Sequence, residues 1–255
     1  MDLNGSVAVV TGGGTGIGAA VAEGLARAGA SAVLVGYTRS EDEARSVVER
    51  LCAAGAVGSE AVAMDVTDDD AVRAVARDVV ARHGRVDVLV NNAGATVAVP
   101  FEDLEGATDA IWHDVLDVNL VGAYRCARAL GPALRTAGGA VVNVASISAY
   151  RALGSSIVYG VSKAALLQLT RGLARALAPE VRVNAVTPGT VATRWQTALH
   201  GQEGFDVLAA AERERAPLQR TVEPVHVAQA VLGLLGMDLV TGEDVVIDAG
   251  TWLRY

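Results

Sequence analysis

Short runs of β-branched and small apolar residues alternate along the whole chain with longer segments whose apolar residues follow a helical repeat. The short runs lie at residues 6–12, 31–37, 60–66, 86–94, 139–146, 181–189 and 243–250. The helical segments lie at residues 17–29, 40–55, 68–84, about 105–134, 156–178 and 223–236. Strands that are almost continuously apolar, each separated from the next by a helix, are typical of a parallel sheet buried on both faces. The alternation therefore predicts an α/β fold.

Parallel strands joined by right-handed crossovers form a doubly wound Rossmann fold. We expect a single parallel sheet of about seven strands in the order 3-2-1-4-5-6-7, with helices on both faces. Apolar residues make up 51% of the 255 residues, which is enough for one sizeable core. No internal repeat, low-complexity tract or linker interrupts the pattern. We therefore expect one domain over residues 1–255, with a substrate lid at about residues 190–220.

Charge and composition narrow the classes of partner. The formal net charge of −8 argues against a nucleic acid or an anionic membrane as the main partner. No apolar stretch reaches the roughly 18 residues of a membrane span, and the N-terminus has no secretory signal pattern, so we expect a cytoplasmic protein. Cys52 and Cys126 are too few for a disulfide framework, and the histidines are scattered, so we expect no metal site.

A glycine-rich turn follows the first predicted strand in the stretch TGGGTGIG, residues 11–18. Glycine allows a tight turn and a close approach of the backbone to a pyrophosphate, and the next helix directs free N–H groups at that charge. We interpret the pattern as G-x-x-x-G-x-G over Gly12, Gly16 and Gly18. A plain tight turn is the alternative. The position in a strand–helix–strand unit favours dinucleotide binding.

The end of the second predicted strand bears on which dinucleotide binds. An acidic residue about 20 residues past the glycines would bind the ribose 2′-hydroxyl of NAD, but Gly36 occupies this position. Arg39 could hold a 2′-phosphate together with the hydroxyls of Thr38 and Ser40. We therefore favour NADP(H), with NAD(H) possible. The alternative is that Arg39 is a solvated surface charge, and the acids at residues 41–42 weaken the preference.

Polar residues follow two further strands. Asp65 could accept a hydrogen bond from an adenine amino group, or it could cap a turn. The stretch NNAG, residues 91–94, ends the fourth strand, where asparagine side chains can bridge loops and the small residues leave room for a cofactor. At the start of the second predicted helix, Ser40 and Glu43 fit a capping box.

Tyr159 and Lys163 lie four residues apart, so on a helix they are neighbours on one face. A free tyrosine has a pKa of about 10 and is a poor base at neutral pH. A lysine ammonium one turn away stabilises the phenolate, which moves the pKa toward the range that general acid–base catalysis requires. Ser146, at the end of the fifth strand, could supply a second hydrogen bond to a substrate oxygen, and Ser148 is the competing serine. The alternative is an amphipathic helix with an incidental phenol and ammonium.

These motifs, taken in order, resemble those of the short-chain dehydrogenase/reductase family. The resemblance covers nearly the whole chain and rests on the TGGGTGIG turn, Asp65, NNAG, Asn119, Ser146, the Tyr159–Lys163 pair and TPG at residues 187–189. It implies that Tyr159 exchanges a proton with the substrate and that Ser146 hydrogen-bonds the substrate oxygen. It also implies that Lys163 holds the ribose hydroxyls and that Asn119 completes a proton relay with water. One departure is DAG at residues 248–250, where the family often has DGG.

The resemblance and the strand ends together assign residues to the cofactor. This set is Gly12, Thr15, Gly16, Ile17, Gly18, Tyr37, Thr38, Arg39, Ser40, Asp65, Val66, Asn92, Ala93, Gly94, Tyr159, Lys163, Pro188, Gly189, Val191 and Thr193. For the substrate we name Ser148, Arg151, Leu153 and Trp195. Trp195 indicates a partly apolar pocket wall, with helix packing as the alternative, and Arg151 could meet an anionic group, with solvation as the alternative.

The overall pattern resembles 3-oxoacyl-acyl-carrier-protein reductases and their relatives. It implies an NADPH-dependent reductase that transfers a hydride to a ketone, a 3-oxoacyl compound or a similar small carbonyl compound, with Tyr159 as general acid or base. A reductase of a sugar or secondary metabolite is equally compatible. An NAD-dependent secondary alcohol dehydrogenase of the same family is the alternative, and a dinucleotide-binding regulator without turnover is a remote one. The family usually assembles as tetramers or dimers, so we expect a homotetramer or homodimer.

Overall fold

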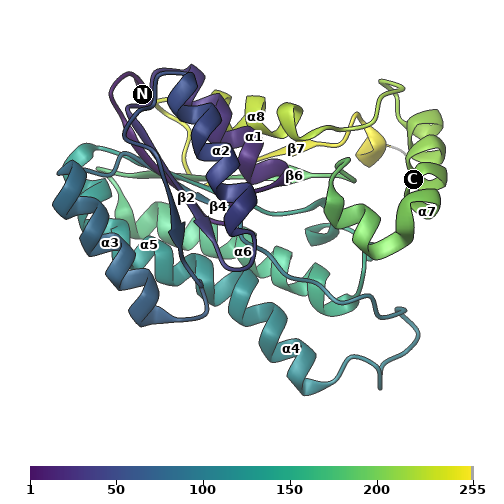
Figure 1. The fold of residues 1–255 in the computed structure, drawn as a ribbon. Helices are drawn as coiled ribbons and strands as arrows, with labels where there is room; N and C mark the ends of the chain where they lie inside the picture. The colour runs from purple at the N-terminus through teal and green to yellow at the C-terminus, as the bar shows by residue number, and fades with distance from the viewer. Residues whose placement is uncertain (254–255) are drawn as a thin grey trace.

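A computed structural model describes residues 1–253, so the last two residues of the predicted domain lie outside the described residues (Figure 1). One parallel sheet holds the strands in the order β3-β2-β1-β4-β5-β6-β7, which confirms the predicted fold class and strand order. The strands are β1 (Val7–Val10), β2 (Ala32–Tyr37), β3 (Glu60–Ala63), β4 (Val88–Asn91), β5 (Ala140–Val144), β6 (Arg182–Pro188) and β7 (Asp244–Ile247).

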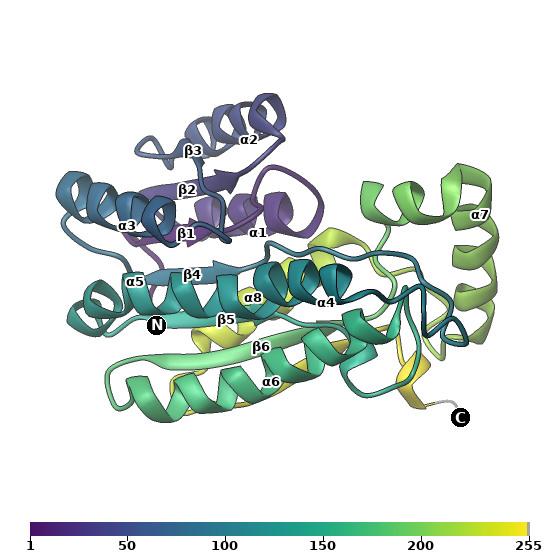
Figure 2. The ribbon, with the colours of Figure 1, turned by 90° about the horizontal axis from the view of Figure 1, so that it is seen from below.

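Helices cover both faces of the sheet (Figure 2). They are α1 (Gly16–Arg27), α2 (Glu41–Ala53), α3 (Asp69–His83), α4 (Asp109–Leu116), α5 (Ala123–Ala137), α6 (Ile157–Leu177), α7 (Arg194–Arg215) and α8 (Pro224–Gly236). One core lies between the sheet and α1, α2 and α8, and the other lies between the sheet and α3, α5 and α6.

The residues of β1 show why the strands are apolar throughout. Ala8 and Val10 belong to the core on the α1 and α8 side, whereas Val7 and Val9 belong to the core on the α3 and α5 side. Successive side chains of a strand point to opposite faces, so a strand in the middle of a two-sided sheet has no face for polar residues. All four side chains are buried, with relative exposures of 0–3%.

The predicted helix over about residues 105–134 is divided in the structure. A loop precedes α4, and a π-helical turn, Asp117–Gly122, joins α4 to α5. Single π-helical turns inside α-helices often lie at functional sites. Here the turn carries Asn119, whose side chain is buried.

The predicted capping box at the start of α2 is wrong. Ser40 is the N-cap residue, but its side chain makes no capping hydrogen bond. The Glu43 carboxylate instead accepts a hydrogen bond from Arg194 at the start of α7, with 2.6 Å between Oε1 and Nη1.

The segment expected to form a substrate lid, residues 190–220, consists largely of α7. A kink at Gly201, which has a φ of 70°, divides this helix, and Phe205 is its buried side chain. The helix lies to the right in Figure 1, beyond the carboxyl ends of the strands. Within residues 1–253, no helix combines the length and apolarity needed to cross a membrane.

Candidate active site

A pocket of about 870 Å³ opens where the carboxyl ends of the central strands meet α6 and the start of α7. Ligands of open α/β sheets bind at this edge. Its lining includes these residues predicted from the sequence: Gly12, Thr15, Gly16, Ile17, Arg39, Asn92, Ala93, Gly94, Ser146, Tyr159, Lys163, Pro188, Gly189, Val191, Thr193 and Trp195. The fold therefore brings together one set of residues predicted from strand ends far apart in the sequence.

The turn after β1 leaves no space for side chains at its glycines. A Cβ atom on Gly18 would lie 2.3 Å from the Gly12 carbonyl oxygen and 2.6 Å from Asn92 Nδ2. A Cβ atom on Gly12 would lie 3.1 Å from the Ala93 Cα atom. The backbone of residues 12–18 is thus closely packed in front of α1, and we call this turn the glycine cradle. A turn of this kind at the start of a helix is suited to bind the diphosphate of a dinucleotide.

Hydrogen bonds hold this cradle against the end of β4. Asn92 Nδ2 donates to the carbonyl oxygens of Thr11 and Gly12, at 3.0 and 2.9 Å. The Thr11 hydroxyl oxygen accepts from the backbone N–H groups of Asn92 and Ala93, at 3.0 and 2.9 Å. The NNAG stretch therefore bridges two loops, as its asparagines indicated, whereas the contribution of Thr11 was not recognised in the sequence.

Two of the acids near the end of β2 are paired with arginines other than Arg39. Glu41 is paired with Arg45, at 2.6 Å, and Glu43 is paired with Arg194. Within residues 1–253, Arg39 makes no salt bridge or hydrogen bond, and it lines the pocket. Of the two acids that weakened the sequence prediction, Glu41 thus has an arginine partner other than Arg39.

Asp65 lies at a turn beside this region. Its carboxylate accepts hydrogen bonds from the backbone N–H and the hydroxyl of Thr67, at 2.9 and 2.7 Å. These bonds hold the pKa of Asp65 below its ordinary value, and the charge of Arg39 adds to the effect. The structure therefore shows the turn-capping alternative, and the adenine contact remains a prediction.

Tyr159 and Ser146 both lie in the pocket wall. Both side chains line the pocket, and the Ser146 hydroxyl is close enough to the phenol to affect its pKa. Burial raises the pKa of Tyr159 above its ordinary value, and the Ser146 hydroxyl opposes that shift. The sequence argument predicted a lowered pKa. The direction differs because loss of solvent around the phenol is the larger effect.

Lys163 is buried one helical turn from Tyr159. Its Nζ atom lies 5.7 Å from the centre of the tyrosine ring and donates to the Val144 carbonyl oxygen at 2.9 Å. Burial lowers the pKa of Lys163 from 10.5 to about 8. The ammonium is therefore held beside the phenol at a cost in solvation, which is unusual for a lysine without a carboxylate partner.

This lowered pKa makes a testable prediction, because Lys163 is the only lysine of the sequence. Protein labelled with carbon-13 at the lysine ε-position gives one signal for the side chain. We expect its titration midpoint near the value of about 8 rather than at 10.5. A midpoint near 10.5 in the folded protein would contradict the buried, desolvated state of the ammonium.

The same shift predicts how stability depends on pH. The folded protein releases the Lys163 proton at a lower pH than the unfolded chain, so the cost of burying the charge is fully present below about pH 8 and disappears as pH rises to 10.5. Lys163→Met removes this cost. At neutral pH, removal of the buried charge should raise the free energy of unfolding by up to about 3 kcal/mol. Loss of the hydrogen bond to Val144 should lower it by about 1 kcal/mol. Urea unfolding should show the advantage shrinking across that window, and a pH-independent difference would contradict the assignment.

Asn119 lies behind the pocket rather than in its lining. Its Nδ2 group donates to the Ala95 carbonyl oxygen and to the Ser162 hydroxyl, each at 2.9 Å, and its Oδ1 atom accepts from the Ala95 N–H at 2.7 Å. A Cβ atom on Gly94 would lie 3.5 Å from Asn119 Oδ1 and 3.8 Å from Lys163 Nζ. Asn119 therefore joins the loop after β4 to α6 close to Lys163, and its predicted relay role stays a proposal.

The predicted substrate residues separate into two groups. Trp195 lines the pocket, with its ring centre 6.4 Å from that of Tyr159. Ser148 is buried, and its hydroxyl oxygen lies 3.2 Å from that of Ser146. Arg151 differs from the expectation of an anionic substrate contact, because its guanidinium lies 4.9 Å from the Trp252 ring centre and bonds the Trp252 carbonyl oxygen. Leu153, in the same loop, is outside the pocket lining.

Some predicted cofactor residues lie outside the pocket lining. Gly18 lies beneath the cradle. Val66 packs on Gly122, because a Cβ atom added to Gly122 would lie 2.7 Å from Val66 Cγ2. The remaining ones, near the end of β2, are Tyr37, Thr38 and Ser40. Conversely, the pocket is lined by Arg194 and Gln196, which sequence reasoning did not select.

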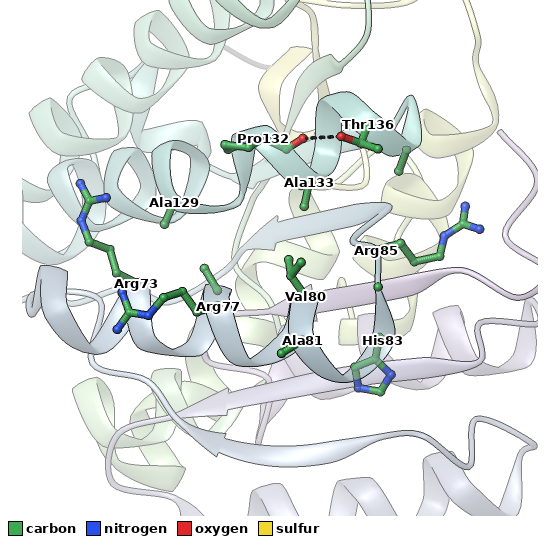
Figure 3. A pocket seen from close by; sticks show the side chains of 13 residues that line it. Arg73, Arg77, Val80, Ala81, His83, Arg85, Ala129, Pro132, Ala133 and Thr136 are labelled. Atoms are coloured by element: carbon green, nitrogen blue, oxygen red, sulfur yellow. Dashed lines mark hydrogen bonds between the residues drawn. The ribbon is translucent and has the colours of Figure 1, made fainter.

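A second pocket, of about 1010 Å³, lies between α3 and α5 (Figure 3). Arg73, Arg77 and Arg85 line it on one side, and the alanine-rich surface of α5 lines the other. Arg73 is paired with Asp69 and Arg85 with Asp87. This groove reaches the residues that precede β4, so it lies away from the carboxyl ends of the strands. It holds none of the predicted site residues.

The fold and the pocket define an oxidoreductase that uses a nicotinamide dinucleotide. A family model described as enoyl-(acyl carrier protein) reductase matches residues 12–251. The chain belongs to the short-chain dehydrogenase/reductase family. The resemblance recognised in the sequence is thereby confirmed.

Similar proteins carry several activities. A protein named as a ketoacyl reductase of the granaticin polyketide synthase, from Streptomyces violaceoruber, is 40% identical over 97% of this chain and 96% of its own length. The D-xylose 1-dehydrogenase of Caulobacter vibrioides is 36% identical, and the 3-oxoacyl-acyl-carrier-protein reductase of Staphylococcus epidermidis 35%, with coverage of at least 96% of each chain. The solved structure of a short-chain dehydrogenase/reductase from Burkholderia xenovorans has a TM-score of 0.89 at 35% identity, and covers 97% of this chain and 98% of its own.

Proposed function

We propose that the protein is an NADPH-dependent reductase of a ketone, with a 3-oxoacyl or similar small carbonyl compound as substrate. The observation that carries the proposal is that Ser146, Tyr159 and Lys163 line the same pocket as the glycine cradle. Relatives named as ketoacyl and 3-oxoacyl reductases support the substrate class. The relative named as a D-xylose dehydrogenase supports the alternative, an alcohol dehydrogenase that works in the opposite direction.

Each residue of the pocket has a role in this proposal. The cradle at Gly12–Gly18 holds the diphosphate, and Lys163 holds the ribose hydroxyls. NADPH, when bound, supplies the hydride. As negative charge develops on the carbonyl oxygen, Ser146 donates a hydrogen bond to it and Tyr159 donates its proton. The Lys163 ammonium beside the ring stabilises the phenolate that remains.

The protonation state of Tyr159 fits a role as proton donor. Burial raises the pKa of Tyr159, so the phenol is protonated at neutral pH, which is the state that a proton donor needs. Alcohol oxidation would need the phenolate as base and would be favoured at high pH. We therefore expect reduction to proceed at neutral pH. The expectations of a cytoplasmic location and of a homotetramer or homodimer stay predictions.

The preference for NADPH depends on Arg39. In Arg39→Ala, we expect the dissociation constant for NADPH to rise roughly 10- to 100-fold, because a charge-assisted hydrogen bond to the 2′-phosphate is lost. Binding of NADH should change less than about twofold, since it has no 2′-phosphate. Isothermal titration of both nucleotides measures the two constants.

Arg77→Ala is the matched control, because this guanidinium lies in the groove between α3 and α5, away from the pocket (Figure 3). It should leave both dissociation constants unchanged. An Arg39→Ala variant that keeps the full preference for NADPH would remove the proposed cause, and a wild-type preference for NADH would favour the alternative dehydrogenase.

A further inference from the structure

Arg194 connects the start of α7 to α2 near the glycine cradle at one end of the pocket. Its side chain lines the pocket, and its Nη1 group donates to Glu43 Oε1 at 2.6 Å. Glu43 lies in the first turn of α2, on the far side of the glycine cradle. The two residues are 151 positions apart in the sequence, so the fold alone brings them together.

The cradle lies directly beneath this connection. A Cβ atom on Gly16 would lie 3.2 Å from Thr193 Cγ2, so the residue before Arg194 packs against the cradle. A Cβ atom on Gly14 would lie 3.2 Å from the Ala44 backbone nitrogen, so the residue after Glu43 packs against it from the other side. The Arg194 side chain therefore spans the glycine turn where a diphosphate would lie.

The guanidinium has hydrogen-bonding capacity left for a ligand. It carries five N–H donors, and only the Nη1 group is engaged with Glu43. Its side chain is 58% exposed, and the carboxylate is 47% exposed, so the pair is accessible to an anion. An exposed ion pair of this kind contributes little to stability by itself.

We propose that Arg194 binds the diphosphate of the dinucleotide and that Glu43 is the anion paired with its guanidinium when the pocket is empty. This inference depends on the proposed function, because it assumes a dinucleotide in the pocket. It assigns to Arg194 a different phosphate from that of Arg39, because Arg194 adjoins the cradle at Gly16 whereas Arg39 follows β2. Arg194 therefore contributes to NADH and NADPH binding alike, and it couples a bound dinucleotide to the start of α7.

The test compares Arg194→Met and Glu43→Gln by isothermal titration with NADH and NADPH. In Arg194→Met we expect both dissociation constants to rise about tenfold, with their ratio unchanged within about twofold. In Glu43→Gln we expect binding as tight as wild type or tighter, because the guanidinium loses only its competing anion. Both residues are exposed, so both variants should fold, and thermal unfolding checks this.

The outcomes separate this inference from the proposed function. If Arg194→Met binds both nucleotides like wild type, or if Glu43→Gln weakens binding as much as Arg194→Met, the pair only ties α7 to α2 and the inference is wrong. Loss of NADPH binding alone would also overturn it, because it would assign Arg194 to the 2′-phosphate. If wild type binds neither nucleotide, the proposed function itself fails.

Discussion

Tyr159→Phe is expected to lower kcat for carbonyl reduction about 10³-fold, within the range that general acid catalysis contributes. The variant keeps the ring and loses only the hydroxyl, which belongs to a residue of the pocket lining. The substrate oxygen then has no proton donor in the transition state, while the cradle for the dinucleotide is intact. Steady-state rates together with the dissociation constant for NADPH separate the two effects, and only the rate should fall.

Tyr124→Phe is the matched control for this substitution. Tyr124 is 43% exposed on α5, and its ring lies under Arg128 rather than in the pocket. Its loss of a hydroxyl should leave kcat unchanged. Undiminished activity of Tyr159→Phe would overturn the assignment of the proton donor, and equal losses in the two variants would show that the effect is not local.

Gly18→Ala is expected to weaken binding of both dinucleotides at least about 100-fold, which corresponds to about 2.7 kcal/mol. The added Cβ atom would lie 2.3 Å from the Gly12 carbonyl oxygen and 2.6 Å from Asn92 Nδ2, closer than non-bonded atoms allow. The cradle must therefore open, and the bonds from Asn92 that hold it to β4 must lengthen. Overpacking of this kind also lowers the free energy of unfolding by about 1–3 kcal/mol.

Gly172→Ala provides the comparison for Gly18→Ala. Gly172 lies in α6, and no atom would lie within 4 Å of its Cβ. This variant should bind both nucleotides normally and gain roughly 0.5–1 kcal/mol of stability, because glycine is unfavourable inside a helix. Normal binding by Gly18→Ala would show that the turn after β1 does not hold the diphosphate.

Local patterns explain why the fold could be predicted from the sequence. Val7 to Val10 of β1 are apolar on both faces because both faces are covered, and this burial is visible in the sequence as a continuous run. The glycine cradle and the Tyr159–Lys163 spacing are similarly local. Each depends on residues within about one turn of helix or one tight turn, so the sequence alone specifies them.

The pairings between distant, exposed side chains could not be predicted. Glu43 fitted a capping box by its spacing from Ser40, but its carboxylate accepts a hydrogen bond from Arg194, 151 residues away. Arg151 lies in a loop near the site, yet the C-terminal segment binds its guanidinium. The direction of the Tyr159 pKa shift depends on burial, which spacing does not reveal. In each case the decisive neighbour arrives through the tertiary fold.

The most direct test of the account is a single-turnover reaction of the NADPH-saturated protein with a panel of ketones that includes a 3-oxoacyl thioester. Loss of the reduced nicotinamide absorbance and formation of the alcohol are followed together. The account predicts that wild type forms one alcohol for each NADPH consumed at neutral pH, and that Tyr159→Phe does so about 10³-fold more slowly. A wild-type protein that binds NADPH but consumes none of it with any carbonyl compound of the panel would contradict the account.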